Sequence, residues 1–223
     1  RLVDPVRLAG PSGNNVFAAV EFQRGQIIFE DEPALLAFGH MSLSKLWLQY
    51  KQLSPEKQDI MHDLPKGLDK LERLCPGKQL KREDLSEQTN LSAGELEQAW
   101  NFFRIFDRNC STHRHMDDGY LLYLHLGRLK HSCRPNAMTD DAKLESDDTR
   151  TNKQMLPVRD PFKKALVAKS DIAEGEEITI SYLGEEELMQ PRELRQQKLL
   201  NSFGFVCACK RCSEDSDALL RGI

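Results

Sequence analysis

The sequence lacks long apolar runs and lacks an excess of positive charge. No hydrophobic stretch approaches the ~20 residues needed to cross a bilayer, and the start has neither a signal-peptide core nor an initiator Met. The formal net charge of -4 argues against a surface dedicated to nucleic-acid phosphates and mildly favours cationic partners. We therefore expect part of an intracellular protein, from nucleus or cytoplasm, that binds neither membranes nor nucleic acid directly.

Cysteine is infrequent but strongly clustered. Three of the six cysteines form the C-x-C-x-x-C pattern Cys207, Cys209 and Cys212. Such close pairs are poor disulfide partners but good chelators, which favours a reducing compartment and a metal. Three thiolates suit tetrahedral zinc, and a closed site needs a fourth soft ligand, for which Cys133 is the best candidate. We predict one structural zinc on these four residues, with Cys75 and Cys110 as ordinary buried or half-buried thiols.

The chain reads as β-rich at both ends and helical in the middle. With 223 residues and 39% hydrophobic content it can build one large domain with an insert. Segments 16–20 and 26–29 have strand composition around Gly25. A second stretch repeats the pattern when Gly25 is aligned with Gly175, which sets Phe22 against Ile172.

Residues 42–108 change to a helical period and form a predicted insert. Ser54-Pro55 is typical of a helix start, and Ser92 to Glu95 is a capping box before an apolar stripe. The aromatic run of residues 100–106 is predicted to be core. Residues 139–161 are polar and aperiodic and predict a loop, whereas residues 190–204 predict a last short helix that Gly204 ends.

Two short segments have the composition of a site. The segment from Lys130 to Asn136 contains an imidazole, a hydroxyl, a thiol and a guanidinium before its final Pro-Asn. Taken alone, the segment would indicate only a turn. In the predicted strand 176–182, alternation puts Ile178, Ile180 and Tyr182 on one face. Considered in isolation, that tyrosine is a packed core residue with a satisfied hydroxyl.

Taken in order, these segments resemble the SET-domain lysine methyltransferases over nearly the whole chain. The matching motifs are residues 12–18 and 30–33, the loop 130–136, the strand 175–182, and the segment from Phe203 through the cysteines. The insert and the short cysteine ending are most similar to the SET/MYND branch, although this chain has neither a MYND finger nor a C-terminal helical repeat. The resemblance implies a β-rich α+β SET fold of small twisted sheets with a pseudoknot, a helical insert and a zinc-binding post-SET segment.

The resemblance also implies roles for individual residues. S-adenosylmethionine (SAM) would be the cofactor, and Tyr182 would lie at the point of methyl transfer. The residues that would bind the cofactor are Ser12, Gly13, Asn14, Asn109, Lys130, His131, Tyr182 and Phe205. Two positions depart from the family pattern: Asn15 replaces the usual second glycine, and Lys130 replaces the asparagine that touches the cofactor's amino-acid end.

The leading functional hypothesis is a SAM-dependent protein-lysine N-methyltransferase. Two alternatives remain, a catalytically silent SET module that binds protein partners and a SET fold turned to small-molecule chemistry; Lys130 favours both, because its ammonium would repel the cationic cofactor. The expected partner is a protein or histone lysine in a basic peptide, which the acidic run Glu185 to Glu187 would attract if it borders the cleft. We expect a SET domain over residues 1–202 and a cysteine-rich post-SET segment over 203–223.

Overall fold

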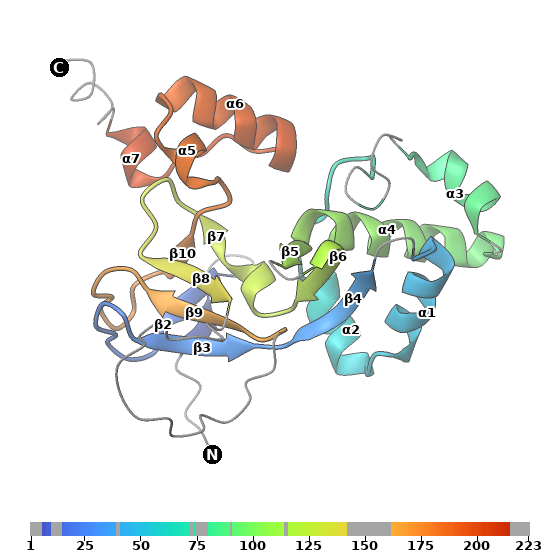
Figure 1. Ribbon diagram of the computed structural model, residues 1–223, viewed down its shortest axis with the longest axis horizontal. Coiled ribbons are helices and arrows are strands. Elements are labelled where there is room, and N and C mark those ends of the chain that lie inside the picture. The colour runs from blue at the N-terminus through green and yellow to red at the C-terminus, as the bar shows by residue number, and fades with distance from the viewer. Residues whose placement is uncertain are drawn as a thin grey trace.

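The structure, a computed structural model, describes residues 6–9, 15–38, 41–71, 74, 80–89, 91–113, 116–141 and 162–214. In the view of Figure 1, β3, β8 and β9 lie to the left of the sheet of β4, β5 and β6, which lies beside α1, α2 and α4, and the C-terminal helices lie above β7 to β10. Among the described helices, none combines the length and apolarity that a membrane span requires.

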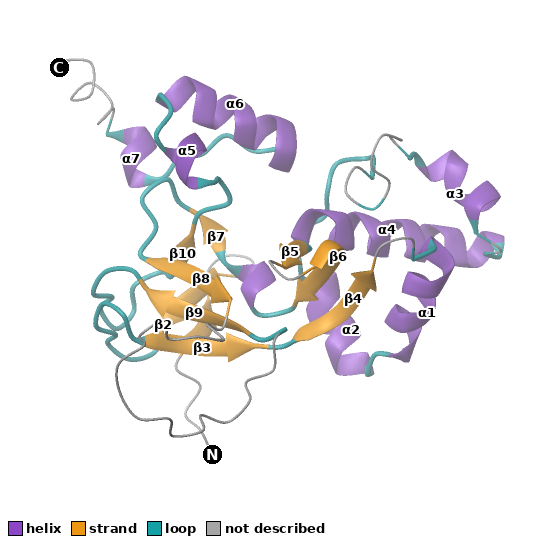
Figure 2. Cartoon of the chain, viewed as in Figure 1, coloured by secondary structure: helices purple, strands orange, loops and turns teal. Residues whose placement is uncertain are grey.

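The strands are short, as Figure 2 shows. Their bounds are β1 Val6–Ala9, β2 Asn15–Ala18, β3 Ile27–Asp31, β4 Pro33–Phe38, β5 Ser111–His113, β6 Met116–Tyr123, β7 Lys130–His131, β8 Ala137–Asp141, β9 Lys164–Ala168 and β10 Thr179–Ile180. Antiparallel pairing joins β1 to β2 and builds two sheets in the orders β3-β9-β8 and β4-β6-β5, while β7 pairs parallel to β10. The predicted fold of small sheets with a helical insert is confirmed.

The two glycine turns pair with each other across the fold. Gly25 and Gly175 both adopt a left-handed backbone, with φ of 88° and 82°. The Gly25 amide donates to the Ala168 carbonyl, and the Gly175 amide donates to the Ala18 carbonyl, at 2.8 and 2.9 Å. Because Ala18 and Ala168 are equivalent in the alignment of the two glycines, the weak internal repeat seen in the sequence corresponds to a reciprocal pairing of two similar turns.

The helices fall into an insert and a C-terminal group. Their bounds are α1 Leu43–Gln52, α2 Pro55–His62, α3 Arg82–Gln88, α4 Ala93–Asn109, the 3-10 helix η1 Leu126–Arg128, α5 Glu185–Leu188, α6 Arg192–Phe203 and α7 Lys210–Ser213. The predicted starts of α2 and α4 are confirmed: Ser54 accepts from the Lys57 amide, and Ser92 and Glu95 form a capping box. Gly204, with φ 73°, ends α6 as predicted.

The insert has its own core around the aromatic face of α4. Trp47 stacks on Tyr50 at 4.9 Å between ring centroids, Tyr50 stacks on Phe102 at 4.5 Å, and Phe103 is fully buried. The prediction that the aromatic run of α4 is core is confirmed, because its side chains fill the space between α1, α2 and β4. The last turn of α4 nevertheless leaves the core and reaches the candidate site.

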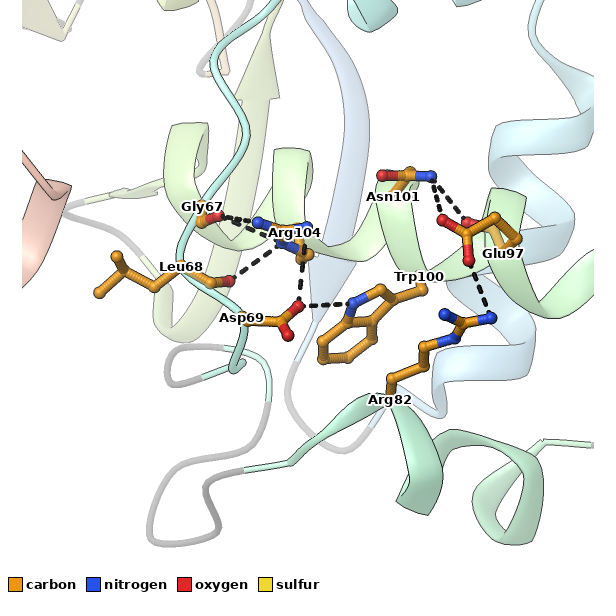
Figure 3. Close-up of polar contacts among 8 residues, drawn as sticks. All are labelled: Gly67, Leu68, Asp69, Arg82, Glu97, Trp100, Asn101 and Arg104. Carbon is orange, nitrogen blue, oxygen red and sulfur yellow. Dashed lines mark hydrogen bonds and ion pairs between the residues drawn. The ribbon is translucent and has the colours of Figure 1, made fainter.

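Polar contacts tie the loop after α2 to α4, as Figure 3 shows. The Arg104 guanidinium donates to the carbonyls of Gly67 and Leu68, and the Trp100 indole donates to Asp69 at 3.0 Å. This loop also approaches the C-terminal segment. A side-chain carbon of Leu68 packs so close to Gly204 that a Cβ at that position would lie 3.2 Å from it. The insert therefore borders the end of α6 directly.

Two predictions about local structure were wrong. The strand expected over 176–182 is reduced to Thr179–Ile180, because Asn136 bonds to the Thr179 amide and the Glu177 carbonyl and β7 offers only two residues for pairing. Residues 139–141, expected in a loop, belong to β8 and pair with β9. An edge strand tolerates polar side chains, so polarity alone misled the prediction. Residues 142–161 lie outside the described residues.

Candidate functional site

The loop 130–136 and the segment after β10 lie side by side. Parallel pairing joins Lys130 to Thr179 and His131 to Ile180, and the Ser132 amide donates to the Ile180 carbonyl at 2.9 Å. These contacts join the two segments that the predicted pseudoknot would bring together. They set His131 beside Tyr182, although the two residues are 51 positions apart.

Tyr182 and His131 are held by hydrogen bonds on several sides. The Tyr182 hydroxyl donates to the Leu129 carbonyl at 2.6 Å, and the Tyr182 amide donates to His131 Nδ1 at 3.0 Å. Because Nδ1 is an acceptor, the neutral ring carries its proton on Nε2, which lies 3.2 Å from Cys133 Sγ. Burial, with the charge of Arg195, lowers the pKa of His131 to about 4, so the ring is neutral at pH 7.

Aromatic rings from the C-terminal segment surround Tyr182. The ring centroid of Tyr182 lies 5.0 Å from Phe203 and 6.2 Å from Phe205, and Phe205 lies 6.1 Å from His131. The structure thus brings together three of the residues named by the sequence: Tyr182, His131 and Phe205. Phe203 belongs to the same group but was not anticipated, because its position in α6 suggests only helix packing.

A cavity of about 540 Å³ opens beside Tyr182. It is lined by residues from α4, β5, β6, η1, β8, β9, the β10 region and the end of α6, namely Arg108, Asn109, Cys110, Ser111, Thr112, Tyr120, Tyr123, Leu126, Gly127, Leu129, Thr139, Lys164, Ile180, Ser181, Tyr182 and Phe203. Its size lies within the range of small-molecule or side-chain binding pockets. Tyr182 is shared by the cavity and the aromatic group, whereas His131 and Phe205 are absent from the described lining.

Arg108 links the insert to this site and was missed from the sequence. It lies in the last turn of α4, donates to the Phe203 carbonyl, and has its guanidinium 5.9 Å from the Phe203 ring centroid. Burial raises the pKa of Tyr182, and the charge of Arg108 partly offsets that rise. A basic residue at a helix C-terminus is normally explained by its favourable interaction with the helix dipole. The sequence therefore gave no indication of this contact.

The other predicted cofactor residues have different surroundings. The Asn109 amide group donates to the carbonyls of Pro65 and Ile105 at 2.8 and 2.7 Å, and Asn109 lines the cavity. The Lys130 ammonium lies 3.7 Å from Glu177, and its side chain is 55% exposed. Ser12, Gly13 and Asn14 lie outside the described residues. The neighbouring Asn15, which departs from the family pattern, begins β2 and is buried.

The four predicted zinc ligands converge. The sulfurs of Cys133, Cys207, Cys209 and Cys212 all lie within 4.8 Å of one another. Cys133 Sγ is 3.9 Å from Cys207 Sγ and 3.6 Å from Cys212 Sγ. A tetrahedral zinc with Zn–S bonds near 2.3 Å would require sulfur separations of about 3.8 Å, so the donor set and its size fit the ion. The C-terminal cluster is therefore consistent with a zinc site.

The surroundings of these thiols differ. Burial raises the pKa of Cys133 to about 11 and also raises that of Cys207. Burial opposes ionisation of Cys209 too, but hydrogen bonds that include the amides of Cys133 and Cys212 lower its pKa to about 6. The loop therefore supplies one ready thiolate, while the ionisation of the buried thiols would have to be driven by a metal.

The comparisons with known proteins agree with this architecture. The chain is 33% identical over 94 residues to the histone-lysine N-methyltransferase SET5 of Scheffersomyces stipitis, a match that covers 42% of the chain and 16% of that relative. It is 36% identical over 91 residues to the histone-lysine N-methyltransferase ATXR2 of Arabidopsis thaliana, which covers 41% of the chain and 15% of that relative. The matched parts are thus a small fraction of these longer proteins.

A solved structure extends the likeness to the whole fold. The crystal structure of the SET domain of LSMT bound to lysine and AdoHcy matches with a TM-score of 0.50 and 13% identity, covering 100% of this chain and 61% of that one. At this identity the match concerns the fold alone. The SET domain family profile matches residues 13–183, which is most of the chain. The chain therefore belongs to the SET domain family.

Proposed function

We propose that this SET domain is a SAM-dependent protein-lysine N-methyltransferase. The observation that carries the proposal is the position of Tyr182 between two groups of residues. On one side it lines the cavity with Phe203 and Asn109, and on the other it contacts His131 and Phe205. Methyl transfer needs a donor and an amine held in line, so a residue shared by the cavity and the adjoining aromatic group suits that reaction.

The cofactor side would be built from residues that the resemblance names. Asn109 and His131 would hold its polar ends, Phe205 would stack on its adenine, and residues 12–14 would contribute backbone groups. Lys130 would lie near the amino-acid end of the cofactor, in place of the family's asparagine. When bound, SAM supplies a methyl group attached to a cationic sulfonium. Aromatic faces and neutral oxygen acceptors stabilise such a cation. The rings of Phe203 and Phe205 offer the first, and the Tyr182 hydroxyl offers the second.

Tyr182 would act as a neutral hydroxyl. Burial raises its pKa, with Arg108 as a smaller opposing influence, so the phenol keeps its proton at pH 7. Its proton is directed to the Leu129 carbonyl. The oxygen lone pairs therefore remain available to orient the acceptor amine, and proton removal from the lysine ammonium falls to solvent or another base.

The acceptor would be a protein lysine, with histones among the candidates because two relatives carry that name. Assignment to the SET/MYND branch is supported by 32% identity over 90 residues to the SET domain and MYND-type zinc finger protein 6 of Schizosaccharomyces pombe, which covers 40% of the chain and 14% of that protein. The clustered cysteines favour a reducing intracellular compartment.

Lys130 is the feature that favours a silent or repurposed SET module. Its contact with Glu177 reduces the weight of that alternative, because the carboxylate partly neutralises the ammonium and the side chain reaches solvent. We expect Lys130 to weaken SAM binding without abolishing it. How far Glu177 neutralises the Lys130 ammonium therefore separates the two hypotheses: the enzyme requires that SAM still binds, and the silent module does not.

The test combines binding and transfer. We expect calorimetric titration of SAM into zinc-loaded protein to show one site, and labelled SAM to methylate lysine in a library of single-lysine peptides. SAM binding without transfer to any peptide would leave only a cofactor-binding module. Absence of SAM binding in folded, zinc-loaded protein would contradict the proposed function.

A further inference from the structure

The largest of the fully buried side chains in the described part of the structure belongs to a charged residue, Arg195. It is 1% exposed and lies in the first turn of α6. Burying a guanidinium is costly unless an opposite charge lies close by. A cation near a helix N-terminus also faces the positive end of the helix dipole. Neither local packing nor helix propensity explains an arginine at this position.

The side chain of Arg195 points toward the cysteine cluster. Its Nη1 donates to the Gln190 carbonyl at 2.6 Å, and its Nη2 lies 3.8 Å from Cys212 Sγ. The same guanidinium also interacts with the thiol of Cys133. Arg195 is therefore in contact with sulfurs at two of the four corners of the cluster.

The negative charge of a zinc-loaded cluster would make this contact favourable. Four thiolates around one divalent ion leave an excess of about two negative charges, enclosed in a largely buried site. The other basic residues nearby are arranged differently. Arg211 donates to the carbonyls of Cys133 and Leu188, and Lys210 is exposed and lies 3.8 Å from Glu214. A fixed cation that contacts the sulfurs from inside the fold would offset part of the excess charge.

We propose that Arg195 is the buried counter-ion of a zinc–tetrathiolate cluster, so that the metal and the guanidinium stabilise each other inside the fold. Outer-shell groups that neutralise or orient ligands typically alter metal affinity by roughly 10- to 100-fold. The inference rests on the zinc site and is independent of methyl transfer. It also gives α6 a second role, because the helix presents a charge to the cluster as well as a packing face.

The test measures zinc affinity by competition with a chromogenic chelator, with folding checked by circular dichroism. Arg195→Gln keeps a hydrogen-bond donor but removes the charge, and we expect it to weaken zinc binding about 10- to 100-fold. Arg195→Lys gives up the planar fork of the guanidinium but keeps the charge, and if the charge dominates, affinity should stay within about threefold of the parent protein. The matched control is Gln196→Leu, which removes a 3.0 Å contact from the same helix to the Cys207 carbonyl without changing charge, and it should leave affinity within about threefold.

A second measurement separates a counter-ion from an ordinary packing residue. If Arg195 neutralises the negative charge of the cluster, Arg195→Gln should lower the stability of the zinc-loaded protein against urea. The same substitution should leave the stability of the zinc-free protein unchanged or raise it. Equal destabilisation with and without zinc, or unchanged zinc affinity in Arg195→Gln, would overturn the proposal. If Arg195→Gln does not fold, Arg195→Lys decides: affinity near the parent value supports the charge role, and a tenfold or greater loss rejects it. Parent protein that binds no zinc would reject both the metal site and this inference, while leaving methyl transfer to its own test.

Discussion

The helical insert, residues 42–108, and the cysteine-rich knot, formed by residues 183–212 with Cys133, border the same site but are stabilised by different physics. The insert buries a large apolar cluster that includes Trp47, Phe102 and Phe103. The buried cluster of the knot is much smaller, and most of it is cysteine: Cys133, Leu183, Leu199, Cys207 and Cys212. Burial of apolar surface stabilises the first in proportion to its area, whereas the second depends on what its thiols bind.

The stability of the two regions should therefore respond to different changes. The insert should respond to the volume of its side chains and little to metal, and the knot should respond to metal and little to the volume of distant side chains. Arg108 forms a hydrogen bond between them, because its side chain reaches from α4 to the Phe203 carbonyl. The substitutions below separate the regions, in order of decreasing expected effect.

Removing zinc should have the largest effect. Binding free energies of structural zinc in small domains are about 10–16 kcal/mol, and much of that energy is folding energy. We expect chelation to increase hydrogen exchange from about Phe203 to the end of α7 and to weaken SAM binding at the proposed cofactor site, to which Phe205 belongs. Exchange in α1 and α4 should stay nearly unchanged; equal loosening of both regions would contradict the comparison.

Truncating the core of the insert should come next. Phe103 is fully buried, so Phe103→Ala should lower the free energy of unfolding by about 3–5 kcal/mol, while zinc affinity stays the same. The control is Leu48→Ala on the exposed side of α1, where the side chain is 58% exposed and the cost should be within about 0.5 kcal/mol. Urea unfolding of zinc-loaded protein measures both. A large loss of zinc affinity in Phe103→Ala would show that the regions are not independent.

Removing the hydroxyl of Tyr182 should act on turnover. Tyr182→Phe keeps the ring against Phe203 but loses the group at the proposed transfer point, and we expect turnover on a confirmed substrate to fall about 100-fold, equivalent to about 2.7 kcal/mol. Tyr50→Phe is the matched control, since it removes a buried hydroxyl that bonds to His62 in the insert. It should lower stability by about 1 kcal/mol and leave turnover unchanged. Unchanged turnover in Tyr182→Phe would reduce that residue to a packing role.

Breaking the link between the regions should have a moderate effect. Arg108→Met removes a charged donor from the Phe203 carbonyl, and we expect it to cost about 1.5–3 kcal/mol of stability. Because Phe203 then loses an anchor beside Tyr182, turnover should fall as well, and hydrogen exchange should rise at the end of α6. A stable variant with unchanged exchange and turnover would show that the contact is incidental.

The smallest effect is expected at Lys130. Lys130→Asn removes a cation from the position where the family pattern has an asparagine that touches the cofactor, so SAM should bind more tightly. The side chain is 55% exposed and paired with Glu177, and solvent screening limits such interactions to below about 1 kcal/mol. Calorimetric titration of SAM into both forms measures the difference. Equal or weaker affinity in Lys130→Asn would mean that this departure from the family pattern does not limit cofactor binding.

The sequence alone determined features whose causes are local. Helix starts at Pro55 and Ala93 follow from the caps Ser54 and Ser92, and the end of α6 follows from Gly204, because each depends on atoms within about one turn. The three close cysteines likewise indicated a metal through their spacing. Strand lengths were less predictable, as β8 and β10 show, since a strand exists only where a partner offers a complementary ladder.

Tertiary structure decided which distant residues meet. Cys133 was proposed as fourth ligand on chemistry and resemblance, but only the path of the chain places its sulfur 3.9 Å from that of Cys207, 74 residues away. Arg108 and Arg195 carry no local signal, because in sequence each is an ordinary basic residue on a helix. Their contacts arise from the packing of α4 and α6 against the segments around Phe203 and the cysteines, and long-range packing of this kind is not encoded by any short pattern of residues.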